Sequence, residues 1–336
     1  MWKRLLATTL CAFALSPAYA QDEVYELRLA HYLPTTHNMA ANVIPEWAKR
    51  IEDASDNRIK ITIYPAGQLL GVTDIFDGVK GGVADLGWSM PGATPGRFPG
   101  MSVMELPFVF QRAEPASQIL MELYEDGYMD DEFDGVEVLY LHTHHPGIIS
   151  SKKKIENLDD LKGQRIRFPS PAVRSLLDAF GAEPIGVPAP ETYESLDRGV
   201  LDGVAFPYDA MQGLRLGELM QYHVDFPMYV LTFYMIMNED KFNSLPEDLQ
   251  QVIRDHSGMD EAMMVGRSWD ESEDSSRAFV LDLGNEIIQL SPEEEGRWTE
   301  RAQGVIQAGI AESAQAGVKA QEMYDYARQR AIELAQ

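Results

Sequence analysis

The segment 165–181 constrains the fold more than any other, because proline and glycine mark where its strand and its helix end. Pro169 ends the strand Arg165–Phe168, and Gly181 follows the helix Pro171–Phe180, which has proline in its first turn. Apolar periodicity also makes strands and helices alternate from residue 24 to residue 88. This alternation predicts an α/β fold with mostly parallel strands.

The chain is too long for a single hydrophobic core. Its 336 residues suggest two domains. The formal net charge of −25 repels nucleic-acid phosphates and anionic membrane surfaces. Nothing resembles a nucleophile elbow, a Walker loop or a dinucleotide glycine motif. We therefore expect a monomer that is not an enzyme and that needs neither a cofactor nor a nucleic-acid partner.

The first twenty residues have the pattern of a secretory signal peptide. Lys3 and Arg4 precede the apolar run Leu5–Leu15, and Ala20 closes a small-residue cleavage motif. The run is too short for a membrane span, which needs about 20 apolar residues. We expect cleavage after Ala20 and a location in the periplasm. Cleavage would also remove Cys11, and a cysteine-free chain suits an oxidising compartment.

The strand Arg165–Phe168 carries two arginines. Strand alternation places Arg165 and Arg167 on the same face. An arginine at the carboxyl end of a parallel strand points into the crevice where α/β proteins bind ligands. The planar guanidinium of Arg167 suits a carboxylate held by two hydrogen bonds, whereas Arg165 fits a surface ion pair better.

A histidine cluster follows the apolar strand Val136–Leu141. His142 and His144 would share a strand face, which is a plausible spacing for metal ligands and leaves open a periplasmic metal-dependent hydrolase. No HExxH motif, matching carboxylate or cysteine accompanies them. We therefore favour hydrogen bonding to a ligand, or structural packing, and expect no metal.

Several ordered motifs resemble the solute-binding proteins of tripartite ATP-independent periplasmic (TRAP) transporters, of the DctP type. The resemblance covers nearly all of residues 24–300. The matching stretches are Leu27–His31, Ile61–Leu69, Gly81–Leu86, Glu105–Phe108, Asp159–Pro169, Gly199–Gly203, Asn238–Phe242 and Leu245–Gln250.

The resemblance implies a two-lobed periplasmic binding protein, type II-like, with two α/β domains joined by hinge strands and a long helix. Residues 21–143 plus about 232–270 would form the first lobe, and residues 144–231 plus about 271–336 the second lobe and the C-terminal helices. Such a protein closes on a small organic acid and delivers it to the TRAP membrane subunits for uptake driven by an ion gradient.

The resemblance also assigns residues to the site. The family's carboxylate-gripping arginine corresponds to Arg167, and the place of a frequent second arginine falls near Gly147. That departure suggests that His144 or His145 replaces the missing donor, and it argues against a sialic-acid-type ligand. An asparagine usual after Gly203 is also absent.

Aromatic residues stand where that asparagine is missing, which favours an aromatic or bulky monocarboxylate as the alternative ligand. Further candidates for the lining follow from their position at strand ends or, for Arg97, from its charge. These candidates are Phe206, Tyr208, Tyr32, Trp88, Met90, Phe233 and Arg97.

The processing expectation is directly testable. The exported protein should begin at Gln21, because Ala18 and Ala20 supply the small side chains that signal peptidase requires. Intact-mass measurement of the periplasmic protein checks this. A mass that retains residues 1–20 would contradict it.

Overall fold

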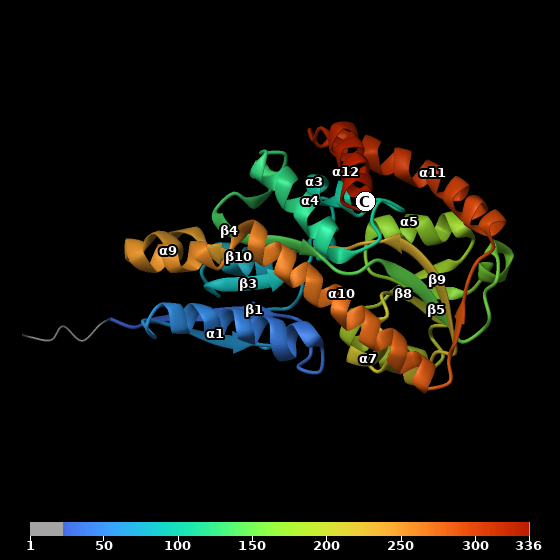
Figure 1. Cartoon of the computed structure of the whole chain (residues 1–336), viewed down its shortest axis with the longest axis horizontal. Helices are drawn as coiled ribbons and strands as arrows, with labels where there is room; N and C mark the ends of the chain where they lie inside the picture. Colours follow the sequence, from blue (N-terminus) through green and yellow to red (C-terminus); the bar gives the residue numbers. More distant parts are fainter. Residues whose placement is uncertain (1–22, 336) are drawn as a thin grey trace, which may run out of the picture.

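The structure has two lobes, each built on its own β-sheet (Figure 1). This computed structural model describes residues 23–335, so the expected leader lies outside the described residues. The first sheet has five strands in the order β2-β1-β3-β10-β4, and the second has six in the order β11-β9-β5-β8-β6-β7. The predicted two-lobed α/β architecture is confirmed.

Short strands form both sheets. The first contains β1 (Tyr25–His31), β2 (Ile59–Tyr64), β3 (Leu86–Ser89), β4 (Val136–Thr143) and β10 (Thr232–Asn238). The second contains β5 (Gly147–Ser151), β6 (Arg165–Phe168), β7 (Glu183–Gly186), β8 (Gly203–Phe206), β9 (Tyr222–Tyr229) and β11 (Glu286–Ile288).

The helices cover the outer faces of the sheets and join the lobes. In chain order they are α1 (Ile44–Ala54), α2 (Ile75–Lys80), α3 (Pro99–Met104), α4 (Ala113–Glu125), α5 (Pro171–Phe180), α6 (Thr192–Asp197), α7 (Asp209–Gly213), α8 (Glu239–Asn243), α9 (Glu247–Asp255), α10 (Gly258–Asp282), α11 (Pro292–Gln315) and α12 (Ala320–Leu334).

Local sequence signals set the ends of β6 and α5 where they were predicted. Gly181 has φ +87°, the left-handed conformation that glycine adopts without strain after a helix. Val173, Leu176 and Leu177 bury one face of α5. Because Pro169 separates the two elements within three residues, Arg167 is held at the carboxyl end of a short, fixed strand.

The expectation of parallel strands is correct for only part of each sheet. β1 is parallel to β2 and β3, and β6 is parallel to β7 and β8. In contrast, β10 is antiparallel to β3 and β4, and β5 is antiparallel to β8 and β9. The physical reason is that β5 and β10 each arrive directly from the other lobe and therefore enter their new sheet in the opposite direction.

Helix α10 connects the lobes and runs diagonally between them in Figure 1. Asp270 accepts hydrogen bonds from the backbone N–H of Ala113 (2.7 Å) and Glu114 (3.2 Å), at the start of α4 in the first lobe. One turn later, Glu273 accepts from the backbone N–H of Tyr208 (2.9 Å) and Asp209 (3.0 Å), where α7 begins in the second lobe. The same helix face thus caps one helix in each lobe.

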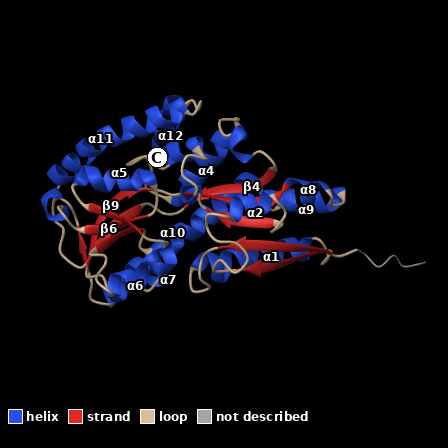
Figure 2. Cartoon of the chain, turned by 180° about the vertical axis from the view of Figure 1, so that it is seen from behind, coloured by secondary structure: helices blue, strands red, loops and turns tan. Residues whose placement is uncertain are grey.

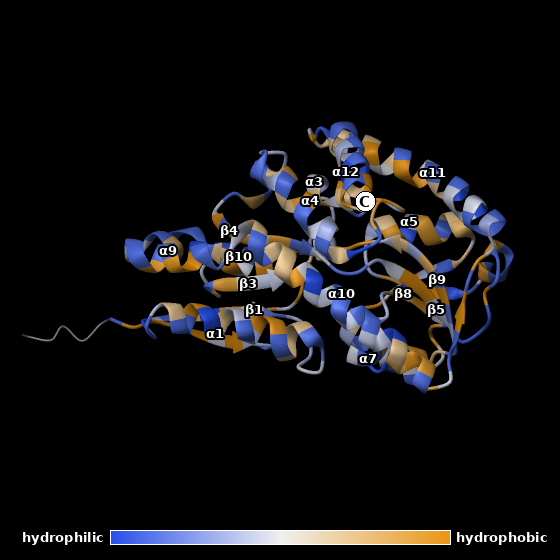
Figure 3. Cartoon of the chain, viewed as in Figure 1, coloured by the Kyte–Doolittle hydropathy of each residue, from blue (hydrophilic) through white to orange (hydrophobic). Residues whose placement is uncertain are grey.

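The two C-terminal helices lie across the back of the molecule, along the upper edge of Figure 2. α11 packs against α5 and α3, and α12 packs against α3 and α4. Trp298 of α11 is fully buried against Phe180, with ring centroids 4.8 Å apart. Figure 3 shows that β5, β8 and β9 are largely hydrophobic, while α10 and α11 carry many hydrophilic residues. Within residues 23–335, no helix has the length and apolar character needed to cross a membrane.

Glu105 is a buried carboxyl group beside the return crossing between the lobes. Its Oε1 accepts hydrogen bonds from the backbone N–H (3.1 Å) and the hydroxyl (3.0 Å) of Thr232, the first residue of β10. Burial raises the pKa of Glu105 to about 7, although these hydrogen bonds oppose the shift. The folded protein therefore keeps a proton on Glu105 that the unfolded chain releases near pH 4.5.

This pKa shift predicts a pH-dependent stability. The contribution of protonated Glu105 to the free energy of unfolding is present in full below about pH 4.5 and is lost as the pH rises through about 7. Glu105→Gln keeps one carbonyl oxygen for both hydrogen bonds but cannot ionise. Its free energy of unfolding should therefore fall less than that of the wild type on going from about pH 5 to about pH 8, by up to roughly 3 kcal/mol. Denaturant titrations at each pH measure this. Equal pH dependence of the free energy of unfolding in the two proteins would contradict the raised pKa of Glu105.

Candidate functional site

A cavity lies between the lobes, where strand ends from both sheets meet. Tyr32, Leu33, His37, Trp88, Met90 and Phe233 line it from the first lobe. Arg167, Ala189, Phe206, Pro207, Asp209, Ala210 and Leu214 line it from the second. His144, Leu231 and Trp269 come from the segments that connect the two. The lining is thus mostly aromatic and apolar, with few polar groups.

Arg167 is the buried cation of this cavity. Only 2% of the residue is exposed. Its Nε donates to the carbonyl oxygen of Val187 (3.1 Å), and Nη1 donates to that of Ala205 (3.4 Å). The guanidinium carbon lies 4.0 Å from the ring centre of Phe206, a cation–π contact. Backbone carbonyls and an aromatic face therefore fix the position of the charge.

No carboxylate neutralises this charge within the part of the chain that the structure describes. The ion pairs found there include Arg165 with Asp202 at 2.8 Å, as predicted for Arg165, but none with Arg167. Burial lowers the pKa of Arg167 to about 10, which still leaves it protonated at neutral pH. Its hydrogen bonds within residues 23–335 use Nε and Nη1, so Nη2 is available to an anion.

Stacked rings form the opposite wall. Trp88 and Phe233 are nearly parallel, with centroids 4.9 Å apart and an angle of 8° between their planes. Tyr32 stacks on Trp88 at 5.5 Å, and Trp269 stacks on Phe233 at 5.8 Å. The indole N–H of Trp88 donates to Nε2 of His142 (2.9 Å), so this tryptophan has no unsatisfied polar group. Together the stacked rings form an apolar wall of the cavity.

His142 supports this wall and is not arranged as a metal ligand. Its Nε2 accepts from Trp88, its Nδ1 faces the carbonyl oxygen of Thr143 (3.3 Å), and the residue is fully buried. Burial lowers its pKa to about 3. Among residues 23–335 no three His, Cys, Asp or Glu side chains are grouped so as to hold a metal ion. The geometry gives the hydrolase alternative no support.

The other two histidines have different surroundings. His144 lines the cavity, but its Nδ1 lies 2.5 Å from the carbonyl oxygen of His145, and its Nε2 accepts from the N–H of Leu231 (3.3 Å). Burial lowers the pKa of His144 to about 4, so it is neutral near pH 7. Both ring nitrogens are therefore already occupied.

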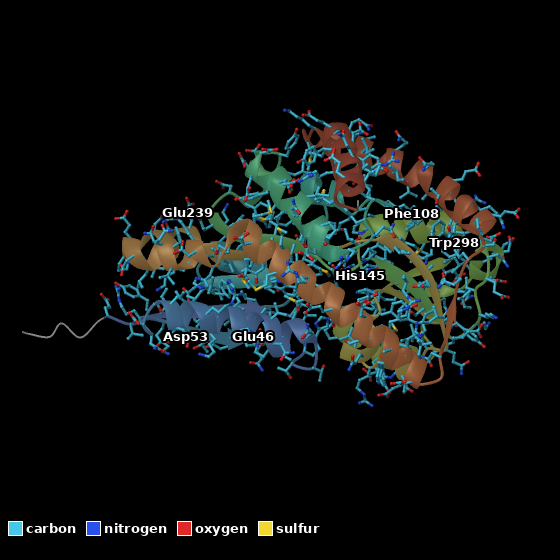
Figure 4. All side chains as sticks on the ribbon, viewed as in Figure 1. Glu46, Asp53, Phe108, His145, Glu239 and Trp298 are labelled. Atoms are coloured by element: carbon cyan, nitrogen blue, oxygen red, sulfur yellow. The ribbon has the colours of Figure 1, made fainter. Side chains whose placement is uncertain are left out.

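His145 lies beside α10, where Figure 4 labels it, and is not among the residues that line the cavity. Its Nδ1 is 2.7 Å from Oδ1 of Asp270. Burial is the largest single effect and lowers the pKa of His145, but the hydrogen bond to Asp270 together with the negative charges of Glu273, Asp270 and Asp274 raises it overall. The structure thus gives His145 a role in joining α10 to the chain crossing.

Two more candidates from the sequence lie outside the cavity lining. Arg97 pairs with Asp77 (2.7 Å) and stacks 4.0 Å above Phe76, because its loop folds over the outside of the first lobe. Tyr208 packs into the second hydrophobic cluster, 5.3 Å from the guanidinium carbon of Arg277. It directly precedes α7, and Phe206, which packs against the same cluster, reaches the cavity lining while Tyr208 does not.

Tyr229 is a feature that the sequence analysis missed. It lies directly opposite Gly147 across the β5–β9 pair. A Cβ atom on residue 147 would stand 2.3 Å from Cζ and 2.6 Å from the hydroxyl oxygen of Tyr229. Tyr229 therefore fills the space that a side chain at position 147 would need. Its hydroxyl is buried and has no hydrogen-bond partner among the described residues.

Polar and aromatic residues of the cavity lining were missed as well, namely His37, Asp209 and Trp269. His37 and Asp209 come from different lobes, and their Nε2 and Oδ2 atoms are 3.0 Å apart. No local motif marks these residues, because they meet only when the lobes come together.

An interlobe cavity with an aromatic wall and a buried cation that has no anionic partner within residues 23–335 is typical of a two-lobed ligand-binding protein for anions. The chain belongs to the DctP family, described as "Bacterial extracellular solute-binding protein, family 7", whose profile matches residues 29–313. It is thus a solute-binding protein of the TRAP type.

Solved structures show the same fold. A marine metagenome TRAP solute-binding protein specific for aromatic acid ligands, in complex with metahydroxyphenylacetate, has a TM-score of 0.88 and 31% identity over 92% of this chain and 99% of that chain. A TRAP solute-binding protein from Rhodoferax ferrireducens with copurified benzoate has the same TM-score and identity over 92% and 98%. A TRAP periplasmic solute-binding protein from Bordetella bronchiseptica with bound mandelate has a TM-score of 0.85 and 29% identity over 92% and 99%.

Because the ring of Tyr229 fills the space beside Gly147, substitutions at these two positions should have coupled effects on stability. Gly147→Ala should lower the free energy of unfolding by roughly 1–3 kcal/mol, because the added methyl group overlaps the phenol ring. In a Tyr229→Ala background the same change should cost little. Denaturant titrations of the four proteins of this cycle measure the coupling. An equal loss of unfolding free energy for Gly147→Ala in both backgrounds would contradict the overlap with the ring of Tyr229.

Proposed function

We propose that this protein is the extracytoplasmic receptor of a TRAP transporter for an aromatic monocarboxylate, held in the interlobe cavity with its carboxylate on Arg167. It delivers the acid to the small and large membrane subunits for uptake driven by an ion gradient. It binds the acid without converting it.

Arg167 is the observation that carries this proposal. A cation that is 98% buried and lacks an anionic partner within residues 23–335 is costly unless a ligand supplies the anion. Because Val187 and Ala205 occupy Nε and Nη1, the ligand carboxylate would approach Nη2 and the outer proton of Nη1. This geometry favours a single carboxylate.

The aromatic wall supports a ring as the remainder of the ligand. Trp88, Phe233 and Tyr32 form an apolar aromatic stack at the cavity, and Phe206 and Met90 add apolar surface. An aromatic ring gains edge-to-face or offset contacts with such a wall that a flexible aliphatic acid does not make. Benzoate, mandelate and metahydroxyphenylacetate are bound in solved structures that are similar to this chain.

Tyr229 is not among the residues that line the cavity, but its hydroxyl, which has no hydrogen-bond partner among the described residues, lies near enough to Arg167 for each group to shift the other's pKa. This hydroxyl would donate a second hydrogen bond to the carboxylate. A phenol donor here would take the part that His144 or His145 was expected to play, while His144 contributes a neutral wall.

The decisive test compares two arginines of the same strand. Arg167→Ala should weaken the binding of benzoate or mandelate by roughly 2–5 kcal/mol, which is at least about 30-fold. Arg165→Ala removes an equal charge from β6 but breaks only the surface pair with Asp202, so its affinity should match the wild type. Titration calorimetry measures both.

Unchanged affinity in folded Arg167→Ala would remove Arg167 from the site. Equal losses in both variants would mean that net charge, rather than a specific contact, attracts the acid. Tyr229→Phe, which keeps the ring, should weaken binding by a smaller factor of about 3–10.

A further inference from the structure

Asp209 is a second charged group in the cavity, and one of its oxygens has no partner. We infer that the ligand carries a hydroxyl group, remote from its carboxylate, that donates a hydrogen bond to Oδ1 of Asp209. The inference rests on the proposed function and narrows its ligand class to hydroxylated aromatic acids.

The surroundings of Asp209 hold its carboxylate in place. The residue is 4% exposed, and its backbone N–H donates to Glu273 of α10 (3.0 Å). Its Oδ2 lies 3.0 Å from Nε2 of His37 in the opposite lobe. Oδ1 is buried and finds no hydrogen-bond partner among residues 23–335. Asp209 lines the interlobe cavity and also a neighbouring hollow beside Asn38 and Ser276. A ligand in the interlobe cavity would supply the missing donor.

Arg167 and Asp209 would contact different parts of the ligand. Arg167 and Asp209 form no ion pair within the described chain, so each is left to bind a different part of the ligand. Arg167 requires an anion, and Oδ1 of Asp209 requires a donor. A hydroxyl group meets the second need without adding charge.

The same arrangement selects against other acids. A second carboxylate on the ligand would meet Asp209 without a proton to share and would be repelled. An acid without a second polar group would leave Oδ1 of Asp209 buried and unsatisfied, a penalty that sites of this kind turn into specificity. Asp209 therefore acts as a specificity-determining residue.

The test compares acids that differ in one donor. Benzoate, its three monohydroxy isomers, 3-hydroxyphenylacetate and the matching methoxy acids are titrated into the wild-type protein by calorimetry. At least one hydroxylated acid should bind about ten-fold tighter than its unsubstituted parent, and its methyl ether, which cannot donate, should lose that gain. If no hydroxylated acid exceeds its parent, or if the ether binds as well, the inference is overturned.

Two variants connect the preference to Asp209. Asp209→Ala, which removes both side-chain oxygens, should reduce the hydroxyl preference about ten-fold and change the affinity for the unsubstituted acid much less. His37→Gln, which alters the interlobe contact but keeps Oδ1, should shift both affinities by a similar factor. A preference that survives Asp209→Ala would overturn the inference, as would a stronger preference for an aminomethyl acid, which points to an ammonium partner. Failure of every aromatic acid to bind, benzoate included, would instead contradict the proposed function.

Discussion

The buried charge of Arg167 is the constraint on which the rest of the site depends. A guanidinium removed from water retains its proton only if the protein supplies compensating dipoles, and here two carbonyl oxygens and the face of Phe206 do so. These contacts fix the group but leave its positive charge unbalanced within residues 23–335. A bound carboxylate would neutralise this charge. Ligand binding should therefore also stabilise the arrangement of the lobes around the cavity.

Closure requires both lobes to present their walls together, and α10 sets how they meet. Asp270 and Glu273 lie on one helix face and cap α4 in the first lobe and α7 in the second. Because α7 begins at Asp209, the position of that carboxylate is tied to α10 and, through His37, to the first lobe. The polar groups of the cavity are thereby held by the same contacts that join the lobes.

The sequence predicted the α/β class, the limits of β6 and α5, and Arg167 in the cavity, because proline, glycine and strand alternation act locally. It placed Arg97, Tyr208 and His145 in the site as well, and these lie elsewhere. The direction of a side chain beyond a strand end depends on the loop or helix that follows, which periodicity does not determine. Tyr229 was missed because its match to Gly147 exists only across the β5–β9 pairing.

A crystal structure of the protein with benzoate would test the central claim most directly. The account predicts the carboxylate oxygens about 2.7–2.9 Å from the guanidinium nitrogens of Arg167, with the ring against Trp88 and Phe233. It also predicts that Arg167 keeps its bonds to Val187 and Ala205. A carboxylate bound to another cation, with Arg167 still lacking an anion, would contradict the account.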